Sequence, residues 1–184
     1  MPELIHFDQS DKKNLQLFLN LRREVFVEEQ QLPENLEFDD AELSKSKPIF
    51  YFIALEAGVV VSGGRVRAYA PRLWKVERVV TKQAARKRGL GNLIMHSIQD
   101  FCRNRDPLSL PILHSQADVY KFYEKLNWLP FGDEFLEAGI KHRRYVFIDP
   151  QNMQLKQLQL ESKIKRWQKL SNLELSQRLL GNHD

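Results

Sequence analysis

Strand-like and helix-like spacing of apolar residues alternate along the first half of the chain. A short apolar run at residues 4–7 predicts a first strand. Apolar side chains then recur at intervals of three and four residues, which predicts a helix over residues 15–30. Runs rich in β-branched and aromatic residues follow and predict an antiparallel meander, with strands at residues 49–56, 59–66 and 74–81.

Turn-forming residues divide these elements. Ala57-Gly58 is a hairpin signal between the first two strands of the meander. Gly63-Gly64 interrupts the second strand, which predicts a bulge or a close approach of another part of the chain. Between the helix and the meander, Pro33 introduces an acidic stretch around Phe38. This stretch is either a solvated loop or a wall that recognises a cationic acceptor.

The second half of the chain repeats the alternation of helix and strand. Asn127 stands where a short helix should end, and asparagine tolerates the left-handed conformation needed there. The predicted segments are helices at residues 89–104 and 117–126 and extended runs at residues 108–116, 128–131 and 142–148. Together the elements predict a single α/β (α+β) domain with a mixed, mostly antiparallel sheet and flanking helices.

The composition changes after Pro150, where glycine is absent until Gly181 and Leu, Gln and Lys dominate. Four residues of this segment share one helical face: Leu160, Ile164, Trp167 and Ser171. The segment is either a helix packed on the domain or a partner-binding helix, for instance in a homodimer. The predicted boundaries are therefore a domain at residues 1–149 and a C-terminal helical extension at residues 150–184.

Composition restricts the cellular compartment that we expect for the protein and the partners that it can bind. The length of 184 residues suits one domain with an appendage, and no apolar run is long enough to span a membrane. The N-terminus lacks a signal-peptide pattern, and the single Cys102 provides neither an internal disulfide nor a zinc-ligand cluster. These features predict a cytoplasmic protein without a metal site. The net charge of +4 permits acidic partners such as cofactor phosphates but does not by itself favour nucleic acid.

A basic loop joins the last strand of the meander to the next helix. It contains Arg86, Lys87 and Arg88, then Gly89-Leu90-Gly91-Asn92, where helical spacing begins. The unpaired amides and the dipole of a helix start bind phosphate groups, and glycine lets a ligand approach the backbone. The Walker A loop and the dinucleotide fingerprint are both absent. The loop therefore predicts a phosphate or pyrophosphate cradle, with a basic solvated turn as the simpler alternative.

The spacing Arg86-x-x-Gly89-x-Gly91 matches the acyl-CoA loop of the GNAT N-acetyltransferase superfamily. Over about residues 3–148 the chain resembles the small bacterial ElaA-like and YjcF-like branch of that superfamily. It departs from the branch at His114-Ser115, where Asn-Ala is usual, and at Asn127-Trp128, where Gly-Phe is usual. The other stretches that carry the resemblance are residues 21–30, 77–81, 113–126 and 132–142.

The resemblance implies a GNAT fold whose sheet is splayed at the cofactor site, with acetyl-CoA as the cofactor. The amides of residues 87–92 would hold the diphosphate, and the pantetheine arm would lie between Val79-Val80 and the strand that ends at Gln116. In the superfamily a tyrosine in the next helix hydrogen-bonds the CoA sulfur. The matching residue is Tyr123, which follows Phe122, and Tyr120 one turn earlier is a competitor.

Acyl transfer to an amine also needs a proton acceptor, because a lysine-like amine has a pKa of about 10 and is protonated at neutral pH. Glu77 is the first candidate, since it directly precedes the strand run expected to contact the cofactor. Its alternative role is a surface charge paired with Arg78. His114 and His142 are further candidates for the base or for acceptor binding. A chain of waters could replace any single base.

The sequence thus predicts an N-acyltransferase that moves acetyl from acetyl-CoA to a small-molecule or protein amine. Glu29 and Phe26 on the first helix are the other candidate acceptor-binding residues. Direct attack in a ternary complex is favoured over a covalent enzyme, because Cys102 lies inside a predicted helix. The alternatives are an acyl-CoA sensor without catalysis and a nucleic-acid-associated protein that uses the basic tail residues Lys163, Lys165, Arg166 and Lys169.

Overall fold

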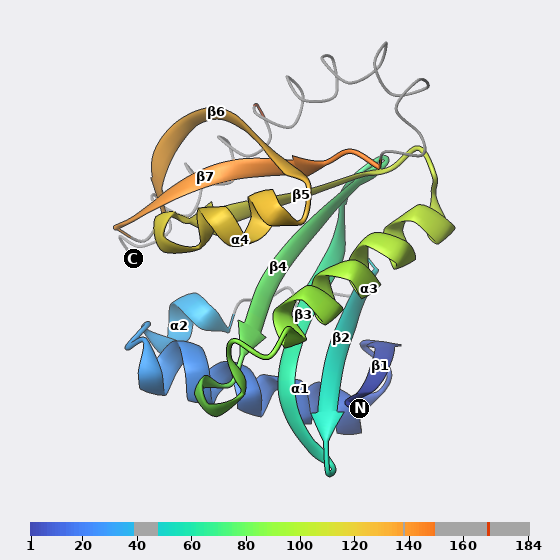
Figure 1. Ribbon diagram of the computed structural model, residues 1–184, viewed down its shortest axis with the longest axis vertical. Coiled ribbons are helices and arrows are strands. Elements are labelled where there is room, and N and C mark those ends of the chain that lie inside the picture. The colour runs from blue at the N-terminus through green and yellow to red at the C-terminus, as the bar shows by residue number, and fades with distance from the viewer. Residues whose placement is uncertain (39–47, 138, 150–168, 170–184) are drawn as a thin grey trace. The chain divides into compact units, whose positions relative to one another are not determined.

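The computed structural model describes residues 1–38, 48–137, 139–149 and 169 (Figure 1). They belong to two structural units, residues 1–113 and residues 114–184 of the chain. The predicted helical extension at residues 150–184 lies outside the described residues except for residue 169. Its fold and its boundary with the domain therefore stay predictions. No helix among the described residues is long and apolar enough to cross a membrane.

The first unit contains a β-meander with helices packed on it (Figure 1). Its strands are β1 Glu3–Asp8, β2 Ile49–Glu56, β3 Val59–Ala70, β4 Leu73–Thr81 and the first residues of β5 Leu110–Gln116. Its helices are α1 Lys12–Arg22, the π-helix Arg23–Glu29 that continues it, α2 Glu34–Glu37, a 3₁₀ turn at Gln83–Ala85, and α3 Leu90–Arg105.

The second unit begins within β5 and consists of a short helix and a hairpin. Its elements are a 3₁₀ turn at Ala117–Val119, α4 Tyr120–Lys125, β6 Trp128–Glu137 and β7 Ile140–Phe147. Asn127, between α4 and β6, has a φ of 61°, so the predicted left-handed residue is confirmed. β6 extends beyond the predicted end at residue 131, because its pairing with β7 resumes at Phe135↔His142 after an irregularity.

The strand order of the sheet is β1-β2-β3-β4-β5-β7-β6. Neighbouring strands from β1 to β4 pair antiparallel, as do β6 and β7. β4 and β5 pair in parallel, from Leu73↔Leu110 to Val76↔Leu113. The predicted mixed, mostly antiparallel sheet is therefore confirmed.

The starts of the N-terminal helices have local causes. Ser10 and Asp11 are the two cap candidates that the sequence offers ahead of the apolar run, and Asp11 is confirmed: its side chain accepts a hydrogen bond from the Asn14 amide at 3.0 Å, and helix α1 begins at Lys12. Residues 34–37 form helix α2 where the sequence suggested a loop. The carbonyl of Pro33 accepts hydrogen bonds from two amides of that helix, and this closes its single turn.

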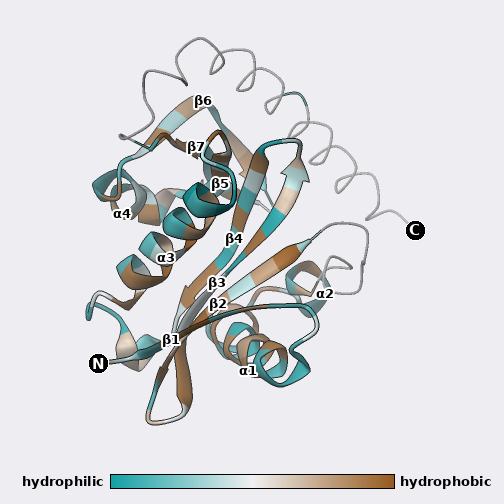
Figure 2. Cartoon of the chain, turned by 90° about the vertical axis from the view of Figure 1, so that its right-hand side faces the viewer, coloured by the Kyte–Doolittle hydropathy of each residue, from teal (hydrophilic) through white to brown (hydrophobic). Residues whose placement is uncertain are grey.

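Helices α1 and α3 cover opposite faces of β3 in the first unit (Figure 2). A Cβ atom built on Gly63 would lie 2.7 Å from the Phe18 ring of α1. A Cβ atom on the next residue, Gly64, would lie 3.1 Å from the side chains of Ile94 and Ile98 of α3. Successive strand residues point to opposite faces of the sheet. Gly63 therefore leaves room for α1 on one face, and Gly64 leaves room for α3 on the other. The close approach predicted at Gly63-Gly64 is confirmed.

Gly63→Ala is expected to lower the free energy of unfolding by about 1–3 kcal/mol. The added Cβ would lie 2.8 Å from the backbone oxygen of Phe52, which cannot rotate away as a side chain can. Urea unfolding followed by circular dichroism measures the change. Val59→Ala in the same strand is the control, because Val59 is 53% exposed. Its effect should stay within about 0.5 kcal/mol, and equal effects of the two variants would contradict the packing argument.

Strand β4 contains a bulge opposite these glycines. The register passes from Gly63↔Val80 to Arg65↔Glu77, which leaves Arg78 and Val79 on β4 opposite the single residue Gly64. Arg78 has a φ of 55°, a left-handed conformation that is uncommon outside glycine. Bulges redirect side chains and are frequent beside functional sites.

Candidate active site

The start of helix α3 has the geometry of an anion-binding site. Gly89 is the N-cap residue, with a φ of 81°, and no side chain caps the helix. The first hydrogen bond of the helix runs from the Leu93 amide to the Gly89 carbonyl at 3.1 Å. In the part of the chain that the structure describes, the amides of residues 87–92 have no hydrogen-bond partner. They are available to an anion, which the helix dipole would also favour.

The charged side chains of this loop are held by partly exposed ion pairs. Arg86 donates two hydrogen bonds to Glu29, at 2.7 and 2.8 Å, and its Nε donates to the Thr81 carbonyl at 3.1 Å. Arg88 donates two hydrogen bonds to Glu56, at 3.0 and 2.7 Å. Exposed pairs of this kind contribute little stability, so a diphosphate can compete for both guanidinium groups.

The π-helix Arg23–Glu29 contains both predicted acceptor-binding residues of the N-terminal segment, Phe26 and Glu29. Besides the Glu29–Arg86 pair, Glu24 of this helix accepts a hydrogen bond from Lys82 at 2.9 Å. Two ion pairs therefore join the π-helix to the segment between β4 and α3, one at Lys82 and one at Arg86. A cationic acceptor would have to displace Arg86 from Glu29, and the acceptor-binding role of Glu29 and Phe26 stays a prediction.

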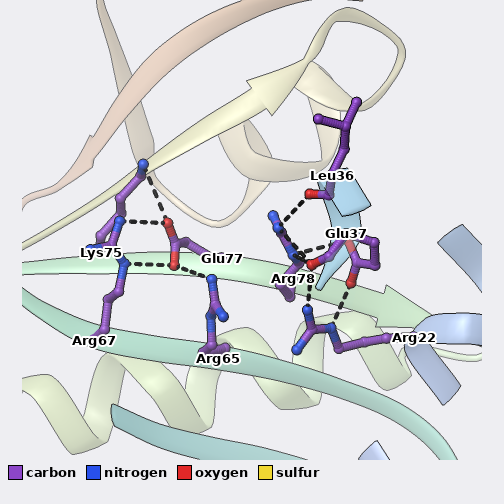
Figure 3. A network of polar contacts seen from close by, with 8 residues as sticks. All are labelled: Arg22, Leu36, Glu37, Arg65, Arg67, Lys75, Glu77 and Arg78. Carbon is purple, nitrogen blue, oxygen red and sulfur yellow. Dashed lines mark hydrogen bonds and ion pairs between the residues drawn. The ribbon is translucent and has the colours of Figure 1, made fainter. Parts of the chain in front are cut away.

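Glu77 lies in a cluster of basic side chains on β3 and β4 (Figure 3). Its carboxylate accepts hydrogen bonds from Arg65 at 2.8 Å and from Arg67 at 2.9 and 3.1 Å. The ammonium group of Lys75 lies 3.3 Å away. The side chains of Arg65 and Glu77 are only 0% and 7% exposed. The suggested alternative, a surface charge paired with Arg78, is therefore wrong: Glu77 is buried and its partners are other cations.

The electrostatics of this cluster bear on the proposed base. Burial raises the pKa of Glu77, but Arg65, Lys75 and Arg67 together outweigh burial and hold that pKa well below its ordinary value. A carboxylate with such a low pKa is a weak proton acceptor at neutral pH. The geometry explains Glu77 as a buried counter-ion, and its catalytic role stays a prediction.

A second buried carboxylate, Glu37 of α2, lies between Arg22 and Arg78 (Figure 3). Arg22 Nε donates to Glu37 Oε1 at 2.6 Å, and Arg78 Nε is 3.0 Å from Oε2. Burial raises the pKa of Glu37, while Arg78 and Arg22 oppose that shift. Arg78 also donates to the carbonyls of Leu36 and Glu37, at 3.2 and 3.0 Å. The bulge residue of β4 thus anchors α2, which sequence reasoning missed.

Tyr123, the predicted partner of the leaving sulfur, lies in the second unit. Its side chain is 8% exposed and packs among aromatic rings, at 4.9 Å from Phe122, 6.4 Å from Trp128 and 6.1 Å from Tyr145. Among the described residues no group hydrogen-bonds its hydroxyl. Burial raises the pKa of Tyr123, so its phenol stays protonated and can donate a hydrogen bond.

The competing tyrosine, Tyr120, packs against a different set of groups. Its ring lies 5.9 Å from that of Tyr145, and the Arg143 guanidinium lies 5.2 Å from its centre. Its hydroxyl is shielded from solvent and has no hydrogen-bond partner among the described residues. The two tyrosines are therefore not equivalent, which makes them a useful experimental pair.

The two predicted histidines lie together in the second unit. His114 Nδ1 is 3.0 Å from a carboxylate oxygen of Glu137, and His142 Nδ1 is 2.9 Å from the carbonyl oxygen of Ile140. Both imidazole rings contact Phe135, at 4.9 and 5.9 Å between ring centres. Glu137 is thus a further candidate residue, and the signal for it lies only in the resemblance over residues 132–142.

The remaining predicted cofactor contacts are less diagnostic. Val80 is buried at 4% exposure, whereas Val79 and Gln116 are partly buried. Their contacts with a pantetheine arm stay predictions.

Across residues 1–38, 48–137, 139–149 and 169, no group of three or more potential metal ligands is close enough to hold an ion. Cys102 is fully buried within α3, and burial raises the pKa of its thiol to about 12.

The sequence model of the acetyltransferase (GNAT) domain family matches residues 10–148. The chain belongs to this family. The predicted membership of the GNAT superfamily is thereby confirmed.

Individual GNAT proteins show how far the similarity extends. The uncharacterized N-acetyltransferase YjcF of Bacillus subtilis strain 168 is 30% identical over 123 residues, which are 66% of this chain and 84% of YjcF. The Escherichia coli ElaA structure has a TM-score of 0.72 at 22% identity and covers 80% of this chain and 100% of its own. An aminoglycoside 6′-N-acetyltransferase complexed with coenzyme A has a TM-score of 0.62 at 14% identity and covers 78% and 95%. The two structures share the GNAT fold with this chain.

Proposed function

We propose that this GNAT chain transfers acetyl from acetyl-CoA to a primary amine by direct attack in a ternary complex. The observation that carries the proposal is the uncapped start of α3, whose amides follow the Arg86-x-x-Gly89-x-Gly91 spacing. A row of unpartnered amides, next to two arginines in exchangeable ion pairs, fits the diphosphate of coenzyme A. The similar aminoglycoside acetyltransferase was solved with that cofactor.

The proposed roles follow from the chemistry of thioester aminolysis. The amides of residues 87–92 and the side chains of Arg86, Lys87 and Arg88 hold the diphosphate. Val79, Val80 and Gln116 border the pantetheine arm. The bound cofactor supplies an acyl group activated as a thioester, and Tyr123 donates a hydrogen bond to the sulfur that leaves.

A direct attack is favoured over an acyl-enzyme because of Cys102. A thiol whose pKa is raised to about 12 is almost wholly protonated at neutral pH, and thiolates, not thiols, are the nucleophiles. Its full burial in α3 also keeps it from substrate. The acceptor amine therefore attacks the thioester itself, with the cofactor and acceptor bound together.

The function is tested by incubating the full chain with acetyl-CoA and a panel of amines, which covers small polyamines, amino sugars and peptides. Release of the CoA thiol together with an acetylated amine is the expected result. Binding of CoA by calorimetry without turnover of any amine would instead identify an acyl-CoA sensor. Salt-sensitive binding of duplex or single-stranded nucleic acid, without affinity for CoA, would point to a nucleic-acid-associated protein.

Asn92→Pro is expected to weaken the binding of CoA about tenfold, because it removes one amide donor to a charged ligand. The amide of Asn92 lies in the first turn of α3, where it has no helical partner, so proline removes no hydrogen bond of the helix. Asn92→Ala is the matched control, since it keeps the amide and changes only an exposed side chain. Calorimetry with CoA gives both dissociation constants. Equal affinities of the two variants would show that this amide does not contact the cofactor.

A further inference from the structure

The π-helix Arg23–Glu29 turns two of its carboxylates, Glu24 and Glu29, toward the segment between β4 and α3. Its hydrogen bonds span five residues, as in the bond from the Gln30 amide to the Val25 carbonyl at 3.0 Å. Residues five apart are therefore neighbours along this helix. In an α-helix the same two carboxylates would point about 140° apart, because each residue turns that helix by about 100°. The π-helical geometry thus lets both carboxylates contact one segment.

The cation bound to Glu29 lies beside the proposed cofactor site. Glu29 accepts two hydrogen bonds from Arg86, and the two side chains are 28% and 38% exposed. Arg86 directly precedes the amides of residues 87–92, to which the proposed function assigns the diphosphate. All of these residues belong to the first structural unit. The Glu29 carboxylate and a bound diphosphate would therefore compete for the same guanidinium group.

Transfer of Arg86 from the carboxylate to the diphosphate changes the charge balance at Glu29. The pair that breaks is partly exposed, and such pairs are weak, whereas phosphate oxygens accept strong charge-assisted hydrogen bonds from a guanidinium group. After the transfer, Glu29 is a carboxylate without its cation, next to a bound anion. Two neighbouring negative charges repel each other, and a cation that binds to Glu29 relieves this repulsion.

We propose that Glu29 is a specificity-determining residue that couples the binding of the two substrates. Coenzyme A takes Arg86 from Glu29, and the released carboxylate then binds a cationic group of the acceptor. The inference rests on the proposed function and adds the acceptor class: an amine that carries a second positive charge, which Glu29 holds while the other amine reacts. The Lys82–Glu24 pair keeps the π-helix attached after Arg86 has moved. Each substrate raises the affinity for the other by the same factor.

The first experiment measures the competition for Arg86 without any acceptor. Glu29→Gln removes the competing carboxylate and should tighten the binding of coenzyme A by about 1.5- to 5-fold in calorimetry, which is the range that exposed ion pairs contribute. Glu28→Gln is the matched control. It removes one negative charge from the same helix, but in the described part of the chain Glu28 forms no ion pair with residues 82–86. Equal or weaker binding by Glu29→Gln would show that Glu29 only orients Arg86, and would overturn the proposal.

The second experiment measures the coupling, with the triamine spermidine as the probe. Calorimetry gives its dissociation constant for the full chain with and without saturating coenzyme A, which carries no acyl group to transfer. Spermidine should bind the unmodified chain about fivefold more tightly when coenzyme A is present. Arg86→Gln should bind spermidine equally in both states, because Glu29 is released in each. Glu29→Gln should lose the coupling, whereas Glu28→Gln should keep it, which accounts for direct attraction between spermidine and the cofactor phosphates.

The outcomes separate this inference from the proposed function. If the unmodified chain does not bind coenzyme A, the proposed function fails and the coupling fails with it. If coenzyme A binds, but spermidine does not bind or binds equally in both states, the coupling is overturned and the proposed acetyl transfer stands. Full coupling in Glu29→Gln has the same meaning. If Glu29→Gln does not fold by circular dichroism, Arg86→Gln decides, because coupling that persists without the Arg86 guanidinium overturns the proposal.

Discussion

Glu77→Gln is expected to lower the free energy of unfolding by about 3–5 kcal/mol, because it removes the charge that balances three buried or nearly buried cations. The side chains of Arg65 and Lys75 are 0% and 4% exposed, and Arg67 is 16% exposed. Glutamine fits the space but presents an amide to groups that need an anion. Urea unfolding of both proteins at pH 7 gives the difference.

Glu34→Gln is the matched control for this variant. Glu34 is also ion-paired with an arginine, Arg23, but the two side chains are 55% and 45% exposed. Solvent screens exposed pairs, so the control should change the free energy of unfolding by less than about 1 kcal/mol. Similar losses for Glu77→Gln and Glu34→Gln would contradict the interpretation of Glu77 as a buried counter-ion.

The contribution of the Glu77 carboxylate to the free energy of unfolding should decrease only as the solution becomes acidic. The cations around Glu77 hold its pKa in the folded chain well below the ordinary value, which is about 4.3 in an unfolded chain. Its contribution to stability is therefore complete above that ordinary value and is lost as the pH falls through the lower folded-state pKa. The gap between the unmodified chain and Glu77→Gln should be constant from pH 6 to 8 and should narrow only in strong acid.

The same variant tests the predicted catalytic role. If Glu77 is a counter-ion, the folded fraction of Glu77→Gln should retain a pH profile with the same acidic limb, even if its rate falls through distortion of the sheet. If Glu77 is also the base, that limb should vanish from the profile of the folded fraction. The pH profile, and not the loss of stability, therefore decides whether Glu77 has the catalytic role.

Local rules explain why much of the fold could be predicted from sequence. At the hairpin between β2 and β3, Ala57 and Gly58 both have positive φ, 47° and 78°, as the tight turn that joins twisted strands requires. Asn127 and the two core glycines of β3 were also recognised from conformational preferences of single residues. The start of α3 follows from the change of spacing at Leu90. Each of these features depends on a few adjacent residues.

The polar partners of the candidate site could not be predicted in this way. Glu77 meets Arg65 because the β3–β4 register places them opposite each other, and the bulge at Arg78 sets that register. His114 meets Glu137 only because β6 continues past residue 131. Hydrophobic spacing indicates which face of an element is buried, but a one-residue change in register replaces every ion pair across the strands. The sequence therefore identified charged candidates without their partners.

Tyr123→Phe is expected to lower kcat for acetyl transfer about 100-fold or more, with KM for both substrates changed only a few-fold. The phenol would donate a hydrogen bond to the thiolate as the C–S bond breaks, and its removal affects the transition state and not the bound substrates. Burial raises the pKa of Tyr123, so the neutral phenol persists at alkaline pH and should not itself produce an alkaline limb. Steady-state kinetics with acetyl-CoA and the best amine of the panel provide the measurement.

Stability separates a catalytic Tyr123 from a merely structural one. The variant keeps the aromatic ring that packs against Trp128 and Tyr145, and among the described residues the lost hydroxyl has no hydrogen-bond partner. The free energy of unfolding should therefore change by less than about 1 kcal/mol. Tyr120→Phe on the same helix is the matched control and should keep its rate within a few-fold. If both variants lose activity equally, or if Tyr123→Phe loses stability in step with activity, the hydroxyl of Tyr123 does not act on the leaving sulfur.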